Sequence, residues 1–136
     1  AVYDADALHA FLGACDDLVG VLPDTPETRG LLDAAAFAAL PPGAFFINVG
    51  RGTLVEDAAL EAALRNGHLG GALLDVFHVE PLPADHPFWT CPRLTVTAHV
   101  AARSWPEDIS RIFRQNYARY RAGATLAYRL DPALGY

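Results

Sequence analysis

Apolar and polar positions alternate along this chain in two distinct ways. Short continuous apolar runs of four or five residues are separated by longer segments in which apolar residues recur at helical spacing. Continuous runs are typical of buried strands, and a 3.6-residue period is typical of amphipathic helices. The predicted strands span residues 18–22, 44–48, 72–76 and 94–98. The predicted helices span residues 4–14, 34–40, 57–66 and 106–122, with a further short helix beginning at Thr25 and Pro26.

This alternation of strands and helices predicts an α/β fold. Strands that read as unbroken apolar runs favour a parallel sheet covered by helices on both faces, joined by right-handed connections. Local signals mark two helix ends: Asp33 can cap the helix at 34–40, and residues 41–43, Pro-Pro-Gly, end it. The segment 77–93 contains several prolines and is expected to be a long irregular loop, which is usually functional or disordered.

Polar residues follow three of the predicted strands. Arg51 lies between Gly50 and Gly52 after the second strand, Glu80 follows the third, and His99 ends the fourth. The carboxyl ends of parallel strands meet at one edge of a sheet, where ligands bind. Arginine offers a fork of donors suited to a carboxylate or phosphate, and histidine transfers protons near neutral pH. Glutamate can orient the imidazole and raise its pKa. The three residues therefore predict an acid–base site for an anionic substrate.

Each of these residues also has a structural explanation when taken alone. Arg51 can be a solvated turn residue, Glu80 a solvated loop carboxylate, and His99 a hydrogen-bonded structural histidine. Their joint placement favours the functional interpretation. Asp75, at the end of the third strand, can be structural or can face a cofactor amide. The remaining histidines are interpreted as surface or loop residues: His9, His68, His78 and His86.

Composition narrows the classes of partner. The 136 residues are enough for one domain with a core, and the formal net charge of −6 argues against nucleic acid or an anionic membrane surface. No apolar run approaches the roughly 20 residues of a membrane span. Cys15 and Cys91 match no metal or redox spacing, so no metal site is expected. We expect a cytoplasmic protein with reduced thiols.

Four motifs, in this order along the chain, resemble those of the D-isomer-specific 2-hydroxyacid dehydrogenases. They are Leu-Pro-Asp-Thr-Pro-Glu-Thr-Arg-Gly at 22–30, Ile-Asn-Val-Gly-Arg-Gly at 47–52, Leu-Asp-Val-Phe with Glu-Pro at 74–81, and Thr-Ala-His-Val-Ala at 97–101. Three further features resemble the glyoxylate/hydroxypyruvate reductase A branch of that family: Pro87-Phe88-Trp89, Pro92-Arg93 and the ending Gly135-Tyr136. The resemblance covers nearly the whole chain and implies the second half of a Rossmann-like sheet from a two-domain dehydrogenase.

The resemblance also implies a reaction and roles for residues. The parent enzyme would transfer hydride from NADPH or NADH to a small 2-keto acid such as glyoxylate or hydroxypyruvate, and the branch favours NADPH. Arg51 would hold the carboxylate and keto oxygen, His99 would protonate that oxygen, and Glu80 would pair with His99. Asp75 would contact the nicotinamide end of the cofactor. The implied cofactor-binding residues are Leu22, Pro23, Val49, Gly50, Arg51, Asp75 and His99.

The chain departs from the family pattern in several places. Ala98 stands where the family usually has proline, and the Gly-x-Gly-x-x-Gly turn that binds pyrophosphate does not occur. Residues 1–105 are therefore expected to be the C-terminal part of a dinucleotide-binding domain. Residues 106–136 would form a helix and tail that return to a substrate domain absent from this sequence. The alternative is a non-catalytic remnant that dimerises or binds a ligand, and in either case we expect a homodimer.

We predict that these 136 residues alone do not turn over substrate and bind dinucleotide weakly. Pyrophosphate binding in such sheets depends on a glycine turn at a helix N-terminus, where free N–H groups meet the charge. Calorimetry with NADPH and a glyoxylate reduction assay on this chain would check the prediction. Micromolar affinity together with measurable turnover would contradict it.

Overall fold

The computed structural model describes residues 2–3 and 5–133. The ending Gly135-Tyr136, which contributes to the branch resemblance, lies outside the described residues. The chain divides into two compact units, Ala1–Val100 and Ala101–Tyr136, and each is considered by itself.

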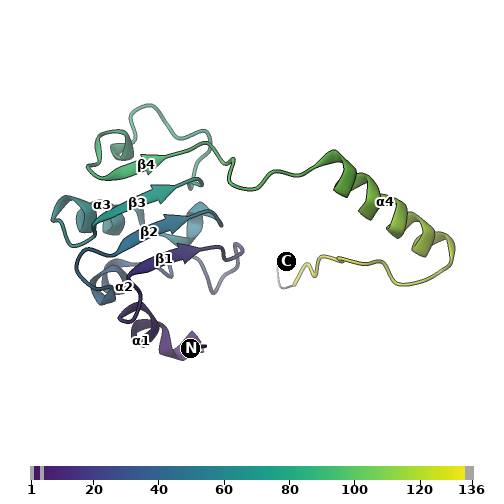
Figure 1. Ribbon diagram of the computed structural model, residues 1–136, viewed down its shortest axis with the longest axis horizontal. Helices are drawn as coiled ribbons and strands as arrows, with labels where there is room; N and C mark the ends of the chain where they lie inside the picture. Colours follow the sequence, from purple (N-terminus) through teal and green to yellow (C-terminus); the bar gives the residue numbers. More distant parts are fainter. Residues whose placement is uncertain (1, 4, 134–136) are drawn as a thin grey trace. The chain divides into compact units, whose positions relative to one another are not determined.

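The first unit is built on a parallel sheet with strand order β1-β2-β3-β4 (Figure 1). The strands span Asp17–Gly20, Phe45–Asn48, Gly71–Leu74 and Leu94–Val96, so all four predicted strands are confirmed to within two residues at each end. The register pairs the last residues of neighbouring strands with one another: Gly20 with Asn48, Asn48 with Leu74, and Leu74 with Val96. The four strands therefore end on one line, and the segments that follow them begin at the same edge.

The helices of the first unit follow the predicted periodicity. A 3-10 turn, η1 (Ala5–Ala7), leads into α1 (Leu8–Leu12), and α2 (Ala34–Ala39) and α3 (Asp57–Arg65) follow. Asp33 caps α2 as predicted, since its Oδ1 accepts the Ala36 N–H at 2.8 Å. Two further 3-10 helices, η2 (Gly52–Leu54) and η3 (Pro87–Thr90), lie in the segments that follow β2 and β3.

The short helix predicted at Thr25 and Pro26 is wrong, because this segment forms turns. The hydroxyl of Thr28 accepts the Thr25 N–H at 2.9 Å and donates to the Pro23 carbonyl at 2.6 Å. Threonine side chains that bond to nearby backbone compete with helix formation. The loop is held by its own side chains instead.

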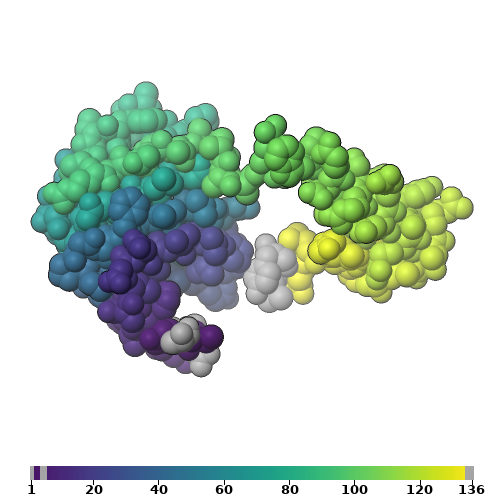
Figure 2. Space-filling model, in the orientation of Figure 1, coloured from purple at the N-terminus to yellow at the C-terminus, as the bar shows by residue number. Residues whose placement is uncertain are grey.

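One face of the sheet carries the core. Phe46 and Ala72 are fully buried in a single cluster with residues of α1, α2 and α3, and the rings of Phe46 and Phe37 meet edge to face with centroids 5.5 Å apart. On the opposite face Val19 is 52% exposed and Ile47 is only half-buried. Within the described residues of this unit, then, the helices pack on the first of these faces. Figure 2 shows the segments coloured from purple through blue to teal packed against one another. The predicted parallel α/β fold is confirmed, but the helices expected on both faces cover one face in the part of this unit that the structure describes.

The second unit contains α4 (Pro106–Arg121), which confirms the predicted helix. The segment after α4 folds back on it: the Asn116 side chain exchanges two hydrogen bonds with the backbone of Ala127, at 2.8 and 3.1 Å. None of the helices in the described part of the chain is long and apolar enough to cross a lipid bilayer.

Candidate active site

The turn that presents Arg51 is closed by the side chain of Asn48, three residues earlier. Asn48, the last residue of β2, is completely buried. Its Oδ1 accepts the Gly50 N–H at 3.1 Å, and its Nδ2 donates to the Arg51 carbonyl at 2.9 Å. A buried amide with partners for both ends fixes the path of the chain as it leaves the sheet.

Glycine is required on either side of Arg51 because other backbone lies in contact. A Cβ atom added at Gly50 would lie 2.9 Å from the Leu22 carbonyl oxygen, and one added at Gly52 would lie 2.0 Å from the carbonyl carbon of Phe77. Side-chain carbons do not approach other atoms this closely. The Arg51 turn is therefore wedged between the segment after β1 and the segment after β3.

Glu80 and His99 are brought into direct contact. His99 Nδ1 lies 2.8 Å from Glu80 Oε2, and Glu80 Oε1 accepts the Phe77 N–H at 2.9 Å. The hydrogen bond from His99, followed by that from Phe77, holds the pKa of Glu80 below its ordinary value. The carboxylate is thus anchored on one oxygen and presents the other to the imidazole.

Asp75 holds the segment that carries His99. It is 1% exposed, and its Oδ1 accepts hydrogen bonds from the Thr97 hydroxyl and, at 3.0 Å, from the Val100 N–H. Its backbone carbonyl accepts the His99 N–H at 2.8 Å. His99 itself has a left-handed φ of 54°, which a non-glycine residue adopts only when its surroundings impose it. Of the two interpretations left open for Asp75, these contacts support the structural one, and a cofactor contact stays a prediction.

Arg51 lies at the same edge but is not paired with the other two. It is exposed, its Nη1 donates to the Gly50 carbonyl at 2.8 Å, and among the described residues it forms no ion pair. Arg51 and His99 each come three residues after aligned strand ends on β2 and β4. The strands that they follow, β2 and β4, are two strand spacings apart, roughly 10 Å. The space between their backbones is bridged by the segment after β3.

The other residues predicted to line a cofactor lie in the same region. Leu22 is exposed and Pro23 half-buried in the segment after β1, while Val49 is half-buried and Gly50 buried in the turn after β2. The contact between Gly50 and the Leu22 backbone makes these two pairs of residues neighbours in space.

An apolar cavity of about 430 Å³ adjoins the Glu80–His99 pair. Its walls come from the segment after β3 and from β4 and the residues that follow: Phe77, Glu80, Pro81, Leu82, Trp89, Val96, Thr97, Ala98 and His99. Apolar walls beside a few convergent polar groups are typical of small-molecule sites.

Sequence reasoning did not single out Thr97 or Asp57. Thr97 lies 22 residues from its partner Asp75, so its one local signal is a hydroxyl two residues before His99. Asp57 begins α3 and lies 3.7 Å from His78 Nε2 and 3.4 Å from His86 Nε2. Burial raises the pKa of Asp57, against the opposing effect of the two histidines. His78 and His86 are loop residues, as the sequence analysis predicted. Their contacts with Asp57 connect the long loop after β3 to α3.

The family follows from a sequence comparison. A family model described as "D-isomer specific 2-hydroxyacid dehydrogenase, NAD binding domain" matches residues 1–101. The chain belongs to this family. It is 47% identical over 133 residues to glyoxylate/hydroxypyruvate reductase A of Serratia proteamaculans, a match that covers 97% of this chain and 42% of the relative. The chain therefore spans less than half the length of that relative.

Solved structures of the family share the fold. A D-isomer-specific 2-hydroxyacid dehydrogenase from Xanthobacter autotrophicus, in complex with NADPH and MES, superposes with a TM-score of 0.94 at 45% identity, covering 99% of this chain and 56% of the other. The NADPH-dependent glyoxylate/hydroxypyruvate reductase of Sinorhizobium meliloti, in complex with NADP and sulfate, has a TM-score of 0.90 at 44% identity, covering 98% and 44%. The predicted Rossmann-like fold of this dehydrogenase family is confirmed.

The Glu80–His99 contact predicts how Glu80 titrates. Its pKa, measured by NMR of the side-chain carboxyl carbon, should lie below the ordinary value of about 4.3 and rise in His99→Ala. Because the folded-state pKa is lowered, the contact stabilises the fold above the unfolded-state pKa. That contribution is lost as the pH falls through the folded-state pKa. Glu61, half-buried on α3 and paired with Arg65, serves as the reference carboxyl. An unchanged Glu80 pKa in His99→Ala would show that the imidazole does not cause the shift.

The wedged turn predicts that alanine at Gly52 destabilises the fold more than alanine at Gly13. Gly52→Ala should lower the free energy of unfolding by about 1–3 kcal/mol or more, since the added carbon meets the backbone of Phe77. Gly13→Ala is the matched control, because a Cβ there would have no contact closer than 3.4 Å. Urea denaturation followed by circular dichroism measures both. Equal stability of the two variants would mean that the turn is not wedged.

Proposed function

We propose that this chain is the part of an NADPH-dependent reductase that carries the proton donor and half of the cofactor site. The enzyme reduces a small 2-keto acid, such as glyoxylate or hydroxypyruvate, to the 2-hydroxy acid. The observation that carries the proposal is the contact of Glu80 with His99 Nδ1 at the carboxyl edge of the sheet. Two relatives whose names state glyoxylate/hydroxypyruvate reductase, one of them described as NADPH-dependent, support the substrate and the cofactor.

His99 is the proton donor in this proposal. Its Nδ1 is turned to Glu80, which leaves Nε2 to face the keto oxygen. Reduction adds a hydride to the keto carbon and a proton to the keto oxygen, and the imidazolium supplies that proton from Nε2. Glu80 stabilises the imidazolium and fixes the ring orientation. Reprotonation of the imidazole by water then restores the site.

Arg51 is the anion-binding residue. Its exposed guanidinium can release the Gly50 carbonyl and take up the substrate carboxylate with two parallel hydrogen bonds. The same charge polarises the keto carbonyl toward hydride addition. Arg51 and His99 follow strands that are roughly two strand spacings apart, which leaves room for a small 2-keto acid between them.

The cofactor supplies the hydride when it is bound. Its nicotinamide ribose and ring would lie along the backbone of Leu22, Pro23, Val49 and Gly50. This region fits such a group because Gly50 brings two main chains together and its neighbours are apolar. Asp75 would be close to the same end of the cofactor through the loop that it organises. The glycine-rich turn for the pyrophosphate is not among the residues of this sequence.

The proposal includes a homodimer in the cytoplasm. Four apolar residues recur on one side of α4 and are exposed in the second unit: Ile109, Phe113, Tyr117 and Tyr120. An apolar row of this kind favours burial against another surface. Cys15 and Cys91 are free thiols, which suits a reducing compartment. The apolar row also favours the second candidate, a non-catalytic dimerising module, which predicts self-association without turnover.

The proposal predicts separable effects of two substitutions in the full-length protein that contains this chain. His99→Ala should lower kcat for glyoxylate by roughly 10²–10⁴-fold with a smaller change in KM, because only the positioned proton donor is lost. Arg51→Ala should raise KM and lower kcat together, and Arg51→Lys should recover part of the loss, since it keeps the charge but not the fork. Steady-state kinetics with NADPH measure these effects.

His9→Ala is the matched control, because His9 is exposed on α1 and is not among the residues proposed to bind substrate or cofactor. It should leave both constants unchanged. A normal rate in His99→Ala would remove the imidazole from the mechanism. A full-length protein without turnover would favour the non-catalytic module.

A further inference from the structure

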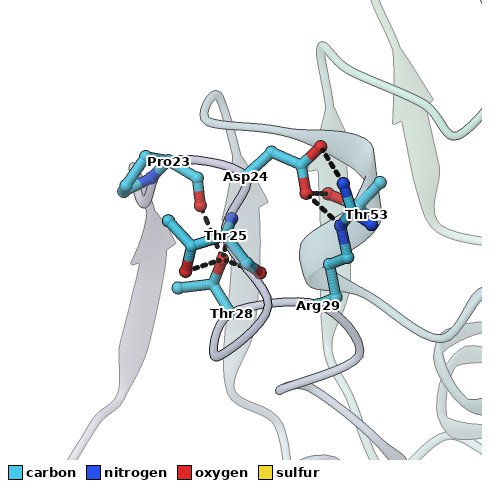
Figure 3. A network of polar contacts seen from close by, with 6 residues as sticks. All are labelled: Pro23, Asp24, Thr25, Thr28, Arg29 and Thr53. Carbon is cyan, nitrogen blue, oxygen red and sulfur yellow. Dashed lines mark hydrogen bonds and ion pairs between the residues drawn. The ribbon is translucent and has the colours of Figure 1, made fainter. Parts of the chain in front are cut away.

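The segment after β1 contains an ion pair that the proposed chemistry does not use. Arg29 Nε lies 2.7 Å from Asp24 Oδ1, and Arg29 Nη2 lies 3.2 Å from Asp24 Oδ2 (Figure 3). The guanidinium thus takes both oxygens of the carboxylate in the fork geometry that gives the strongest such pairs. Asp24 and Arg29 are five positions apart within one loop, and the fold of that loop fixes the geometry of the pair.

A third residue connects this pair to the turn that presents Arg51. Thr53 Oγ1 donates to Asp24 Oδ1 at 2.9 Å, and the Thr53 carbonyl accepts the Gly30 N–H at 2.8 Å. In Figure 3 the side chains of Arg29 and Thr53 converge on the Asp24 carboxylate. Thr53, two residues after Arg51, is therefore attached to the segment after β1 by its side chain and by its main chain.

The loop that supplies Asp24 is held by hydrogen bonds of its own. Thr25 is 5% exposed, and its N–H donates to the Thr28 hydroxyl, which in turn donates to the Pro23 carbonyl. The Thr25 carbonyl accepts the Arg29 N–H at 3.1 Å. Asp24 is flanked by these bonded residues, so its carboxylate is presented from a fixed position.

The contact with Arg29 also changes the titration of Asp24. The pKa of Asp24 is lowered, first by the hydrogen bond from Arg29, then by that from Thr53, and also by the charge of Arg51. Asp24 bonds to Thr53, two residues after Arg51, so the carboxylate lies beside the turn that carries the Arg51 charge. An Asp24 carboxylate without a guanidinium on both oxygens would compete with any anionic ligand for Arg51.

We infer that Asp24, Arg29 and Thr53 are positioning residues for Arg51. The bond from Thr53 to Asp24 fixes the turn, and the fork of Arg29 occupies the carboxylate so that Arg51 stays available to an anion. The inference rests on the proposed role of Arg51 and concerns the residues that keep its guanidinium available to an anion. None of the three residues is assigned a contact with the reacting atoms.

The test uses the full-length protein and the KM for glyoxylate. Arg29→Gln should raise KM by roughly three- to fivefold, the size of a partly exposed ion pair, with kcat nearly unchanged. Arg29→Lys should raise it less. The double variant Asp24→Asn with Arg29→Gln should return KM towards the wild-type value, because the competing charge is gone. Arg65→Gln, which breaks the exposed Arg65–Glu61 pair, is the matched control and should change nothing.

A second readout does not depend on turnover. Thr53→Val keeps the shape of the side chain and removes the hydroxyl, so exchange of the Gly30 amide hydrogen, which bonds to the Thr53 carbonyl, should become at least roughly tenfold faster. Thr53→Ser should restore protection. Circular dichroism verifies that each variant is folded.

The outcomes separate this inference from the proposed function. A wild-type protein without turnover contradicts the proposed function, and the exchange measurement still decides whether Thr53 and Asp24 hold the turn. Equal KM values for wild type and Arg29→Gln, or a double variant no better than Arg29→Gln, overturn the role of Arg29. Unchanged Gly30 exchange in Thr53→Val overturns the role of Thr53.

Discussion

The contact of three main chains at the edge of the sheet is the constraint on which the site depends. Gly50 touches the backbone of Leu22, and Gly52 touches the backbone of Phe77. Strands in a sheet are about 4.8 Å apart, and the segments that leave them have no more room than this unless they diverge. Here they stay together for several residues beyond the last strand hydrogen bonds. Arg51 lies between the two glycines at which they meet.

Polar residues stabilise this arrangement, each from a strand end or from the segment that follows it; Asn48 and Asp75 are buried and Asp24 is half-buried. Asn48 closes the Arg51 turn, Asp75 binds the residues on either side of His99, and Asp24 attaches the turn to the neighbouring loop. Buried polar groups need partners, so each fixes the backbone that satisfies it. The loops of this edge are therefore ordered by hydrogen bonds to acids and amides, in addition to the apolar core on one face of the sheet.

The sequence was sufficient for the features that local pattern controls. Apolar runs located the strands, Asp33 located the start of α2, and the parallel sheet brought Arg51, Glu80 and His99 to one edge. Features that depend on distant partners could not be derived. The bond between Thr97 and Asp75 spans 22 residues, and the bond between Thr53 and Asp24 spans 29. The turn at Thr25 was missed because hydroxyl-to-backbone bonds overrode the helix signal of a threonine before proline.

At His99 the left-handed backbone favours glycine for stability, whereas the proposed chemistry needs the imidazole. A residue with a side chain at φ of 54° costs on the order of 1 kcal/mol, a cost that glycine would not incur. Selection for a more stable fold alone would therefore favour glycine there, and the imidazole would be lost. Attempts to raise the thermal stability of this protein through its loops should leave position 99 alone. The strained backbone of His99 accompanies the orientation of its Nδ1 toward Glu80.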